Sequence, residues 1–244
     1  MKLLIATPLK AGMSGKFLNG LVPTLRQTPH DFITVEGPCV NFARNDAAQM
    51  AVNGGYDALL QIDEDIRWNA GHVVRILSHG VDIVAGCYKV RGGDAWLHYE
   101  SPEATLHLST SGLQPCIRVP AGFLYTTTKA LRAIRDANPD RWYDQREGSD
   151  ERTPVHMEWF PMGVVGEATA SGKLDRIKGI LALIPRMETK GYIPSTALEK
   201  IREVVEKPGE PGRLLGEDYY FCELATRAGF TVYTDTKLQL EHAT

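Results

Sequence analysis

In the first ninety residues, continuous apolar runs alternate with segments whose apolar side chains recur at helical spacing. Four strands are predicted, at residues 2–7, 32–36, 58–62 and 82–88. Two helices are predicted, one that Gly54-Gly55 end and one that Asn69 caps and Gly80 ends. Strands and helices that alternate in this way build a largely parallel sheet flanked by helices, so the expected fold class is α/β.

The remaining residues are expected to complete the same domain. Further strands, partly antiparallel, are predicted at 104–110, 116–120, 122–128, 230–235 and 238–242. Further helices are predicted after a Thr128 cap, at 173–183, at 196–206 and from Glu217 to Gly229. Residues 138–213, rich in Pro, Gly and charge, have the weakest pattern. We therefore predict a single domain over residues 1–244, with a variable insertion at about 138–213.

The composition excludes several classes of protein. The 244 residues are 43% hydrophobic with a formal net charge of −3, so there is no overall basic signature for nucleic acid. No apolar run approaches the ~18 residues of a membrane span, and the apolar start is too short for a signal peptide. The cysteines form no CxxC pair and are predicted to be buried, reduced thiols of a cytoplasmic protein: Cys39, Cys87, Cys116 and Cys222.

Three acids, Asp63, Glu64 and Asp65, directly follow the apolar run 58–62. In an open α/β sheet, ligands bind beyond the carboxyl ends of the strands. Asp63 and Asp65, at i and i+2, can both face one hard cation, and carboxylate oxygens suit Mg²⁺ or Mn²⁺. The alternative is a solvated acidic turn.

Four other side chains are candidates for chemistry, each with an ordinary structural alternative. Asp218, beside Glu217, is a candidate general base, although acids at a helix start often only complement the helix dipole. His242 follows an apolar strand and is either a packed histidine or a metal ligand. Arg44, in an Ala-rich helix, is either a surface charge or a contact to a phosphate or a base at the same end of the sheet.

In order, "LLIATP", "ARNDAAQMAVNGGYDALLQIDEDIRW", "VAGCY", "PAGFLYTTTKAL" and "GEDYYFCELATRAGF", followed by a late histidine, form a recognisable series. The chain resembles family-2-like glycosyltransferases of the GT-A fold, especially the short members encoded by bacteriophages. The resemblance covers roughly residues 1–135 and 214–244. It implies a Rossmann-like, mostly parallel mixed sheet, with 1–90 as the nucleotide-binding half and 91–244 as the acceptor-binding half.

The resemblance also implies roles around a nucleotide-sugar, most commonly a UDP-sugar. Asp65 matches the ligand of Mn²⁺ or Mg²⁺, and Asp63 matches a contact to the metal or the ribose. His242 matches a late histidine that binds metal in some members. The positions that match the nucleotide-binding region are Thr7, Pro8, Arg44, Asp63 and Glu64.

The same resemblance assigns the reacting end of the site. Gly122 and Phe123 match a loop beside the donor sugar, and Asp218, with Glu217 next to it, matches the catalytic base. A base that takes the acceptor proton in a single displacement implies inversion at the anomeric carbon. Because Asp218 opens a helix, its pKa is expected to be lowered.

The acceptor is left open between two classes. Phage relatives include enzymes that glycosylate the hydroxymethyl group of modified pyrimidines in DNA, and Lys173, Arg176 and Lys178 offer a candidate basic patch for DNA. That patch is otherwise the solvated face of an amphipathic helix, and the rival acceptor is a saccharide or a glycan. Two other functions stay as alternatives, a nucleotidyltransferase and a non-catalytic sugar-binding module. The oligomeric state is not predicted.

Overall fold

The structure is a computed structural model, and it describes residues 1–10, 12–37, 39–89, 111–144, 155–165 and 213–242. The chain divides into two compact units, one made of Met1–Pro161 with Glu217–Thr244 and the other of Met162–Gly216. In the second unit, β10 (Gly163–Val165) pairs antiparallel with β11 (Arg213–Leu215). All the features below belong to the first unit.

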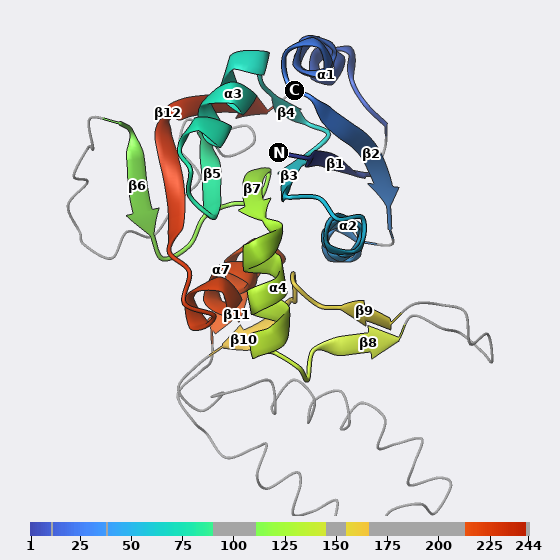
Figure 1. Cartoon of the computed structure of the whole chain (residues 1–244), viewed down its shortest axis with the longest axis vertical. Coiled ribbons are helices and arrows are strands. Elements are labelled where there is room, and N and C mark those ends of the chain that lie inside the picture. The colour runs from blue at the N-terminus through green and yellow to red at the C-terminus, as the bar shows by residue number, and fades with distance from the viewer. Residues whose placement is uncertain (11, 38, 90–110, 145–154, 166–212, 243–244) are drawn as a thin grey trace, which may run out of the picture. The chain divides into compact units, whose positions relative to one another are not determined.

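An eight-stranded mixed sheet forms the centre of the first unit (Figure 1). Its strands are β1 (Leu3–Leu9), β2 (His30–Glu36), β3 (Ala58–Ile62), β4 (Ile66–Arg67), β5 (Ile83–Tyr88), β6 (Leu113–Cys116), β7 (Phe123–Thr127) and β12 (Val232–His242). Their order is β2-β1-β3-β7-β5-β12-β4, and β6 also pairs with β12. β1, β2, β3, β5 and β12 run in one direction, against β4, β6 and β7. A small separate sheet pairs β8 (Trp142–Asp144) with β9 (Val155–Met157).

Helices cover both faces of this sheet. On one face, α1 (Gly15–Gln27) and α3 (Ala70–Ser78) enclose the main apolar core with Phe17, Trp68 and Val73. On the other face lie α2 (Val40–Asn53), α4 (Thr128–Ala137) and α7 (Glu217–Arg227) (Figure 1). The predicted fold class is confirmed as α/β, with a mostly parallel, Rossmann-like mixed sheet flanked by helices.

Most of the predicted strands are present with shifted boundaries, and β4, β8 and β9 have no counterpart in the sequence prediction. β3 coincides with the predicted strand, but β1 continues past Pro8 to Leu9. Proline is tolerated there because pairing with β3 ends at Ala6, so that Pro8 pairs on one side only, with Val35. Of the predicted segment 116–120, only Cys116 belongs to a strand, while 104–110 lies outside the described residues.

Helix α1 has no counterpart in the sequence prediction, which places no element between the first two strands. Ser14 accepts the N–H of Phe17 and caps the helix, while Pro23 lies inside it and weakens its helical signature. Packing compensates, since the ring of Phe17 meets Trp68 edge-on with centroids 4.6 Å apart. A Cβ on Gly20 would come within 2.7 Å of the Trp68 ring, so this close contact requires glycine.

The other helix starts show which capping predictions hold. Asn69 caps α3 as predicted, in a reciprocal pair with His72. The cap of α4 is Thr127 rather than the predicted Thr128, because the Thr127 hydroxyl accepts the N–H of Ala130. The prediction of four buried cysteines is wrong for Cys39, which is exposed at the start of α2.

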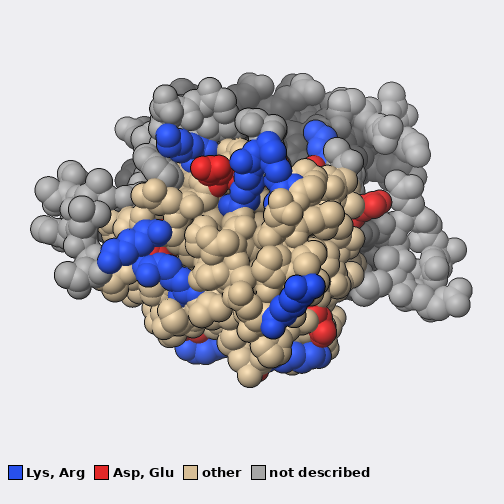
Figure 2. All heavy atoms as spheres, turned by 90° about the horizontal axis from the view of Figure 1, so that it is seen from above, with Lys and Arg blue, Asp and Glu red and all other residues tan. Residues whose placement is uncertain are grey.

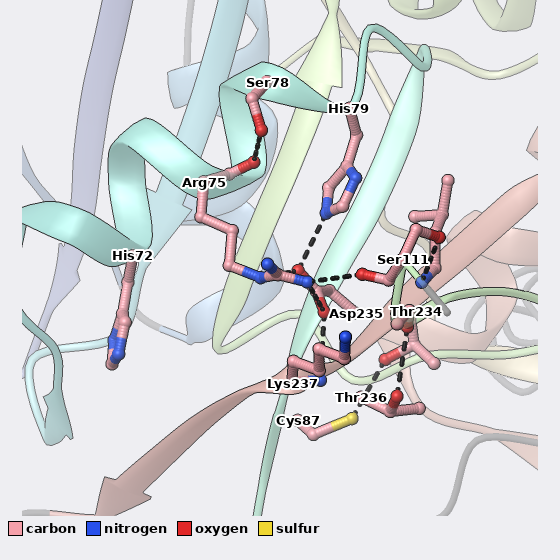
Figure 3. Close-up of polar contacts among 12 residues, drawn as sticks. His72, Arg75, Ser78, His79, Cys87, Ser111, Thr234, Asp235, Thr236 and Lys237 are labelled. Carbon is pink, nitrogen blue, oxygen red and sulfur yellow. Dashed lines mark hydrogen bonds and ion pairs between the residues drawn. The ribbon is translucent and has the colours of Figure 1, made fainter. Parts of the chain in front are cut away.

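The two predicted closing strands are one strand, β12, interrupted by a bulge. Pairing with β5 passes from Asp235–Gly86 to Gln239–Cys87, so three residues of β12 are unmatched. The fully buried Asp235 holds this bulge, as it accepts hydrogen bonds from Arg75 (2.9 Å), His79 (2.7 Å) and the backbone N–H of Lys237 (3.0 Å) (Figure 3). Burial opposes ionisation of Asp235, but these hydrogen bonds outweigh burial and lower its pKa.

Candidate active site

The acidic run 63–65 follows β3 and lies beside the carboxyl end of β1, as the sequence predicts. A pocket of about 380 Å³ opens here, lined by Pro8, Leu9, Lys10, Gly37, Cys39, Val40, Ala43, Asp63, Glu64 and Asp65. An adjoining hollow of about 410 Å³ shares Leu9, Lys10 and Gly37 and continues to Gly12 and Glu36. The strand ends of β1, β2 and β3 and the start of α2 thus surround space for a ligand of nucleotide size.

Asp63 is held in place by Arg44. The Arg44 Nη2 group donates to both carboxylate oxygens of Asp63, at 2.8 and 3.1 Å. Burial raises the pKa of Asp63, and the positive charge of Arg44 offsets part of that rise. A metal ion at Asp63 would have to share this carboxylate with Arg44, so the two aspartates of the motif are not equivalent.

Arg44 is the centre of a buried polar cluster. Its side chain is 3% exposed, and Nη1 donates to the side chain of Gln61 and to the carbonyl of Ala121, both at 3.1 Å. Its Nε lies 3.5 Å from a carboxylate oxygen of Glu217. Burial disfavours the guanidinium charge, but Asp63 and Glu217 outweigh burial and raise the pKa of Arg44. One side chain on α2 therefore joins the acidic run after β3 to the acidic start of α7.

Asp218 lies in the first turn of α7 and accepts the N–H of Tyr219 at 2.8 Å. Burial, followed by the negative charge of Glu217, raises the pKa of Asp218 to about 6. The sequence predicts a lowered pKa at this helix start, and that prediction is wrong because burial and the neighbouring carboxylate outweigh the dipole. A carboxyl group with this pKa is mostly ionised at neutral pH and still basic enough to accept a proton.

Gly122 is packed against the acidic run. Its N–H donates to the Tyr88 hydroxyl at 2.8 Å, and its carbonyl accepts the N–H of Asp63 at 2.9 Å. A Cβ at this position would lie 2.5 Å from the Tyr88 oxygen and 3.2 Å from Asp63, so only glycine fits. The neighbouring Phe123 is fully buried and pairs with Ile62, which places its side chain in the core.

His242 is brought to the same place by the far end of β12. It pairs with Ile66, one residue after the acidic run, and its ring meets Tyr88 edge-on with centroids 5.2 Å apart. His242 also lies near enough to Asp63 to offset part of the rise that burial causes in the pKa of Asp63. The structure therefore brings Asp63, which follows β3, together with Tyr88 of β5 and His242 of β12, while the role of His242 as a metal ligand stays a prediction.

The remaining predicted residues fall in different places. Pro8 and Glu64 line the pocket. Thr7 is fully buried and lies on the same face of β1 as the core residues Leu3 and Ile5. The predicted patch Lys173, Arg176 and Lys178 lies outside the described residues. Within the described ranges, no group of three or more His, Cys, Asp or Glu side chains is arranged to hold a metal. A metal here would need oxygen ligands from a bound substrate or water.

Sequence reasoning missed three residues of the site. Tyr88 contacts Gly122, Gln61 holds Arg44, and the backbone N–H of Lys10 donates to Glu64 at 2.9 Å. A glutamine inside the apolar run 58–62 and a tyrosine at the end of β5 are signals that could have identified two of them. Nothing in the sequence marks Lys10, because its contact is made by the backbone.

The fold and the site define an α/β protein with an acidic pocket at the carboxyl ends of a Rossmann-like sheet. No protein-family model and no curated protein matches the chain. A197 from STIV is one of 25 chains of solved structures that match, with 17% identity, a TM-score of 0.41 and coverage of 54% of this chain and 68% of that chain. A likeness of this size assigns no function, so the function is argued from the site itself. Among the described residues, no helix is long and apolar enough to cross a membrane.

Proposed function

We propose that the protein is a glycosyltransferase that moves a sugar from a nucleotide-sugar, with UDP-sugars as first candidates, to an acceptor hydroxyl. The observation that carries the proposal is the pocket that borders all three acids of the 63–65 run. It lies where α/β sheets bind ligands, beyond the carboxyl ends of parallel strands. The order of motifs along the chain, which resembles that of family-2-like enzymes, is the second support.

The residues at the pocket edge fit a bound Mn²⁺ or Mg²⁺, because carboxylate oxygens are the ligands these ions prefer. Asp65 is the proposed principal ligand, since Asp63 shares its carboxylate with Arg44. His242 is the proposed additional ligand. Such an ion would neutralise the charge of the departing nucleoside diphosphate. Asp63, fixed in position by Arg44, is left to contact the ribose or the ion.

The nucleotide is proposed to lie between the loop after β1 and the start of α2, against Pro8, Leu9 and Gly37. Cys39 at the start of α2 makes no side-chain capping hydrogen bond, which suits an anionic or polar ligand atom at this helix N-terminus. Apolar walls with a few polar groups are typical of sites that hold a base and a ribose.

Asp218 is the proposed general base. It takes the proton of the acceptor hydroxyl as that oxygen bonds to the anomeric carbon and as the bond to the diphosphate oxygen breaks. A single in-line displacement of this kind inverts the anomeric centre. Arg44, which pairs with Glu217 next to Asp218, ties this base to the acidic run. Glu217 is the second candidate for the base.

The acceptor is proposed to be either a hydroxymethylpyrimidine in DNA or a saccharide. The test therefore incubates the protein with a panel of nucleotide-sugars and Mn²⁺, with hydroxymethylated DNA in one arm and oligosaccharides in the other, and detects transfer by mass. Asp65→Ala should abolish turnover and metal-dependent nucleotide binding. Asp136→Ala is the matched control, because Asp136 is 66% exposed and its ion pair in the described part of the chain is with its neighbour Arg135. Full activity in excess chelator, or equal activity of Asp65→Ala, would refute the metal site.

A further inference from the structure

Half of the ten large hydrophobic side chains that are exposed in the described part of the chain belong to one region, α1 with its start and the neighbouring α3. They are Met13, Leu18, Val22, Leu25 and Val74, with exposed fractions of 37%, 40%, 45%, 50% and 49%. Single exposed hydrophobic residues are ordinary on soluble proteins, but several on one helix and its neighbour indicate an interaction surface.

Helix α1 carries two apolar stripes. The buried stripe consists of Phe17, Gly20, Leu21 and Thr24. Leu18, Val22 and Leu25 each follow a buried residue in the chain, so they lie about 100° further around the helix and form a second stripe at i, i+4 and i+7. A helix that only covers a sheet needs one stripe. The second stripe is therefore not needed for packing on the sheet, and it is exposed.

The charge of this region differs from that of the whole chain. α1 and α3 contain Lys16, Arg26 and Arg75 and no aspartate or glutamate, although the chain has a net charge of −3. Figure 2 looks onto the side of the first unit where α1 and α3 lie in Figure 1, and it shows more Lys and Arg than Asp and Glu. Asp235, the partner of Arg75, has a fully buried side chain and presents no carboxylate to the outside.

We propose that this face, the α1–α3 face, docks on the surface of a membrane that contains anionic lipid. Leu18, Val22 and Leu25 would enter the boundary between head groups and acyl chains, and Lys16 and Arg26 would contact lipid phosphates. Helices that lie in a membrane interface combine an apolar stripe with Lys and Arg in this way. The proposal does not depend on the proposed sugar transfer.

Two other occupants fit the face less well. In a symmetric dimer, the same patch would meet itself, so cations of one copy would face cations of the other. Nucleic acid would match the charge but leave three aliphatic side chains without a counterpart, since such interfaces are polar. An anionic lipid surface satisfies both the apolar stripe and the charge.

The test is sedimentation of the full chain with vesicles of phosphatidylglycerol and phosphatidylcholine, compared with vesicles of phosphatidylcholine alone. Wild-type protein should bind the mixed vesicles more tightly, and salt should weaken binding. The Val22→Ser, Leu25→Ser double variant should lose about tenfold or more in partitioning. Lys16→Gln with Arg26→Gln should weaken binding to mixed vesicles and flatten its salt dependence.

The matched control is Met50→Ser, which removes a side chain that is also 50% exposed but lies on α2, on the opposite face of the sheet. This variant should bind vesicles as the wild type does. All the changed side chains are exposed, so the variants are expected to fold, and circular dichroism verifies this. The proposal is overturned if wild-type protein does not bind mixed vesicles or if both α1 variants bind as well as the wild type. Light scattering that shows a dimer, which the Val22→Ser, Leu25→Ser variant dissolves, would overturn it in favour of a self-interface.

Discussion

Replacing Asp218 by asparagine is predicted to stabilise the protein at neutral pH while it removes the proposed base. The pKa of Asp218 rises from 3.8 to about 6 in the folded chain. Each pKa unit corresponds to about 1.4 kcal/mol, so ionised Asp218 lowers the free energy of unfolding by about 3 kcal/mol. Sites that perform chemistry often carry such a cost, and removing it commonly stabilises a protein.

The pH dependence follows from the direction of this shift. Between about pH 4 and pH 6, Asp218 is ionised in the unfolded chain but still protonated in the folded one. The folded state then binds more protons, so wild-type stability falls as pH rises through this window, and the loss is complete above about pH 6. The Asp218→Asn variant cannot ionise and keeps that stability.

Urea denaturation of both proteins from about pH 4 to pH 8 measures the effect. The variant should match the wild type near pH 4 and exceed it by about 2–3 kcal/mol at pH 7 and above. Asp136→Asn controls for the loss of an exposed charge and should show no such pH-dependent gain. A difference between variant and wild type that stays constant with pH, or a variant less stable at pH 7, would refute the reasoning.

Three further predictions follow from the site and the β12 bulge. Asp218→Asn should lower kcat by about 10²–10⁴-fold with little change in donor binding, in steady-state assays once the donor is known; near-normal kcat would move the base to Glu217. Gly122→Ala should destabilise the chain by about 1–3 kcal/mol in urea denaturation, because its Cβ meets the Tyr88 hydroxyl at 2.5 Å, whereas Gly15→Ala, with no atom within 4 Å, should not. Asp235→Asn should cost about 2–4 kcal/mol at neutral pH. Because the pKa of Asp235 is lowered, this difference should shrink as pH falls below about 4, and a difference that persists in acid would contradict the assignment.

Local signals predicted much of the fold. The alternating apolar runs located β1, β2, β3 and β5, and Asn69 predicted the start of α3 because capping depends on residues only three apart. The run 63–65 was placed at a strand end because it directly follows the apolar run 58–62. Helix α1 was missed because Pro23 interrupts its helical pattern and because its stability comes from packing on Trp68, which lies 44 residues from its contact Thr24 in the chain.

Contacts between distant residues decided the rest of the site. Arg44 was expected at the pocket, but its partners Asp63, Ala121 and Glu217 are up to 173 positions away, and no periodicity reports such pairings. The pKa of Asp218 depends on burial by the tertiary structure, which overrides the local helix dipole. The bulge in β12 follows from Asp235 meeting α3, so the sequence pattern showed only two short strands.

The position of β12 has a consequence for how the chain reaches its folded state. β12 is an interior strand, with β5 on one side and β6 and β4 on the other, yet about 140 residues separate it from β5 along the chain. Pairings that close such long loops form slowly, because the entropy of loop closure is lost before the contacts are made. During synthesis, β5 is therefore an unpaired apolar edge until residues 232–242 arrive, and such edges are prone to aggregate. Ribosome-bound or truncated chains that end before β12 would depend on chaperones to shield that edge.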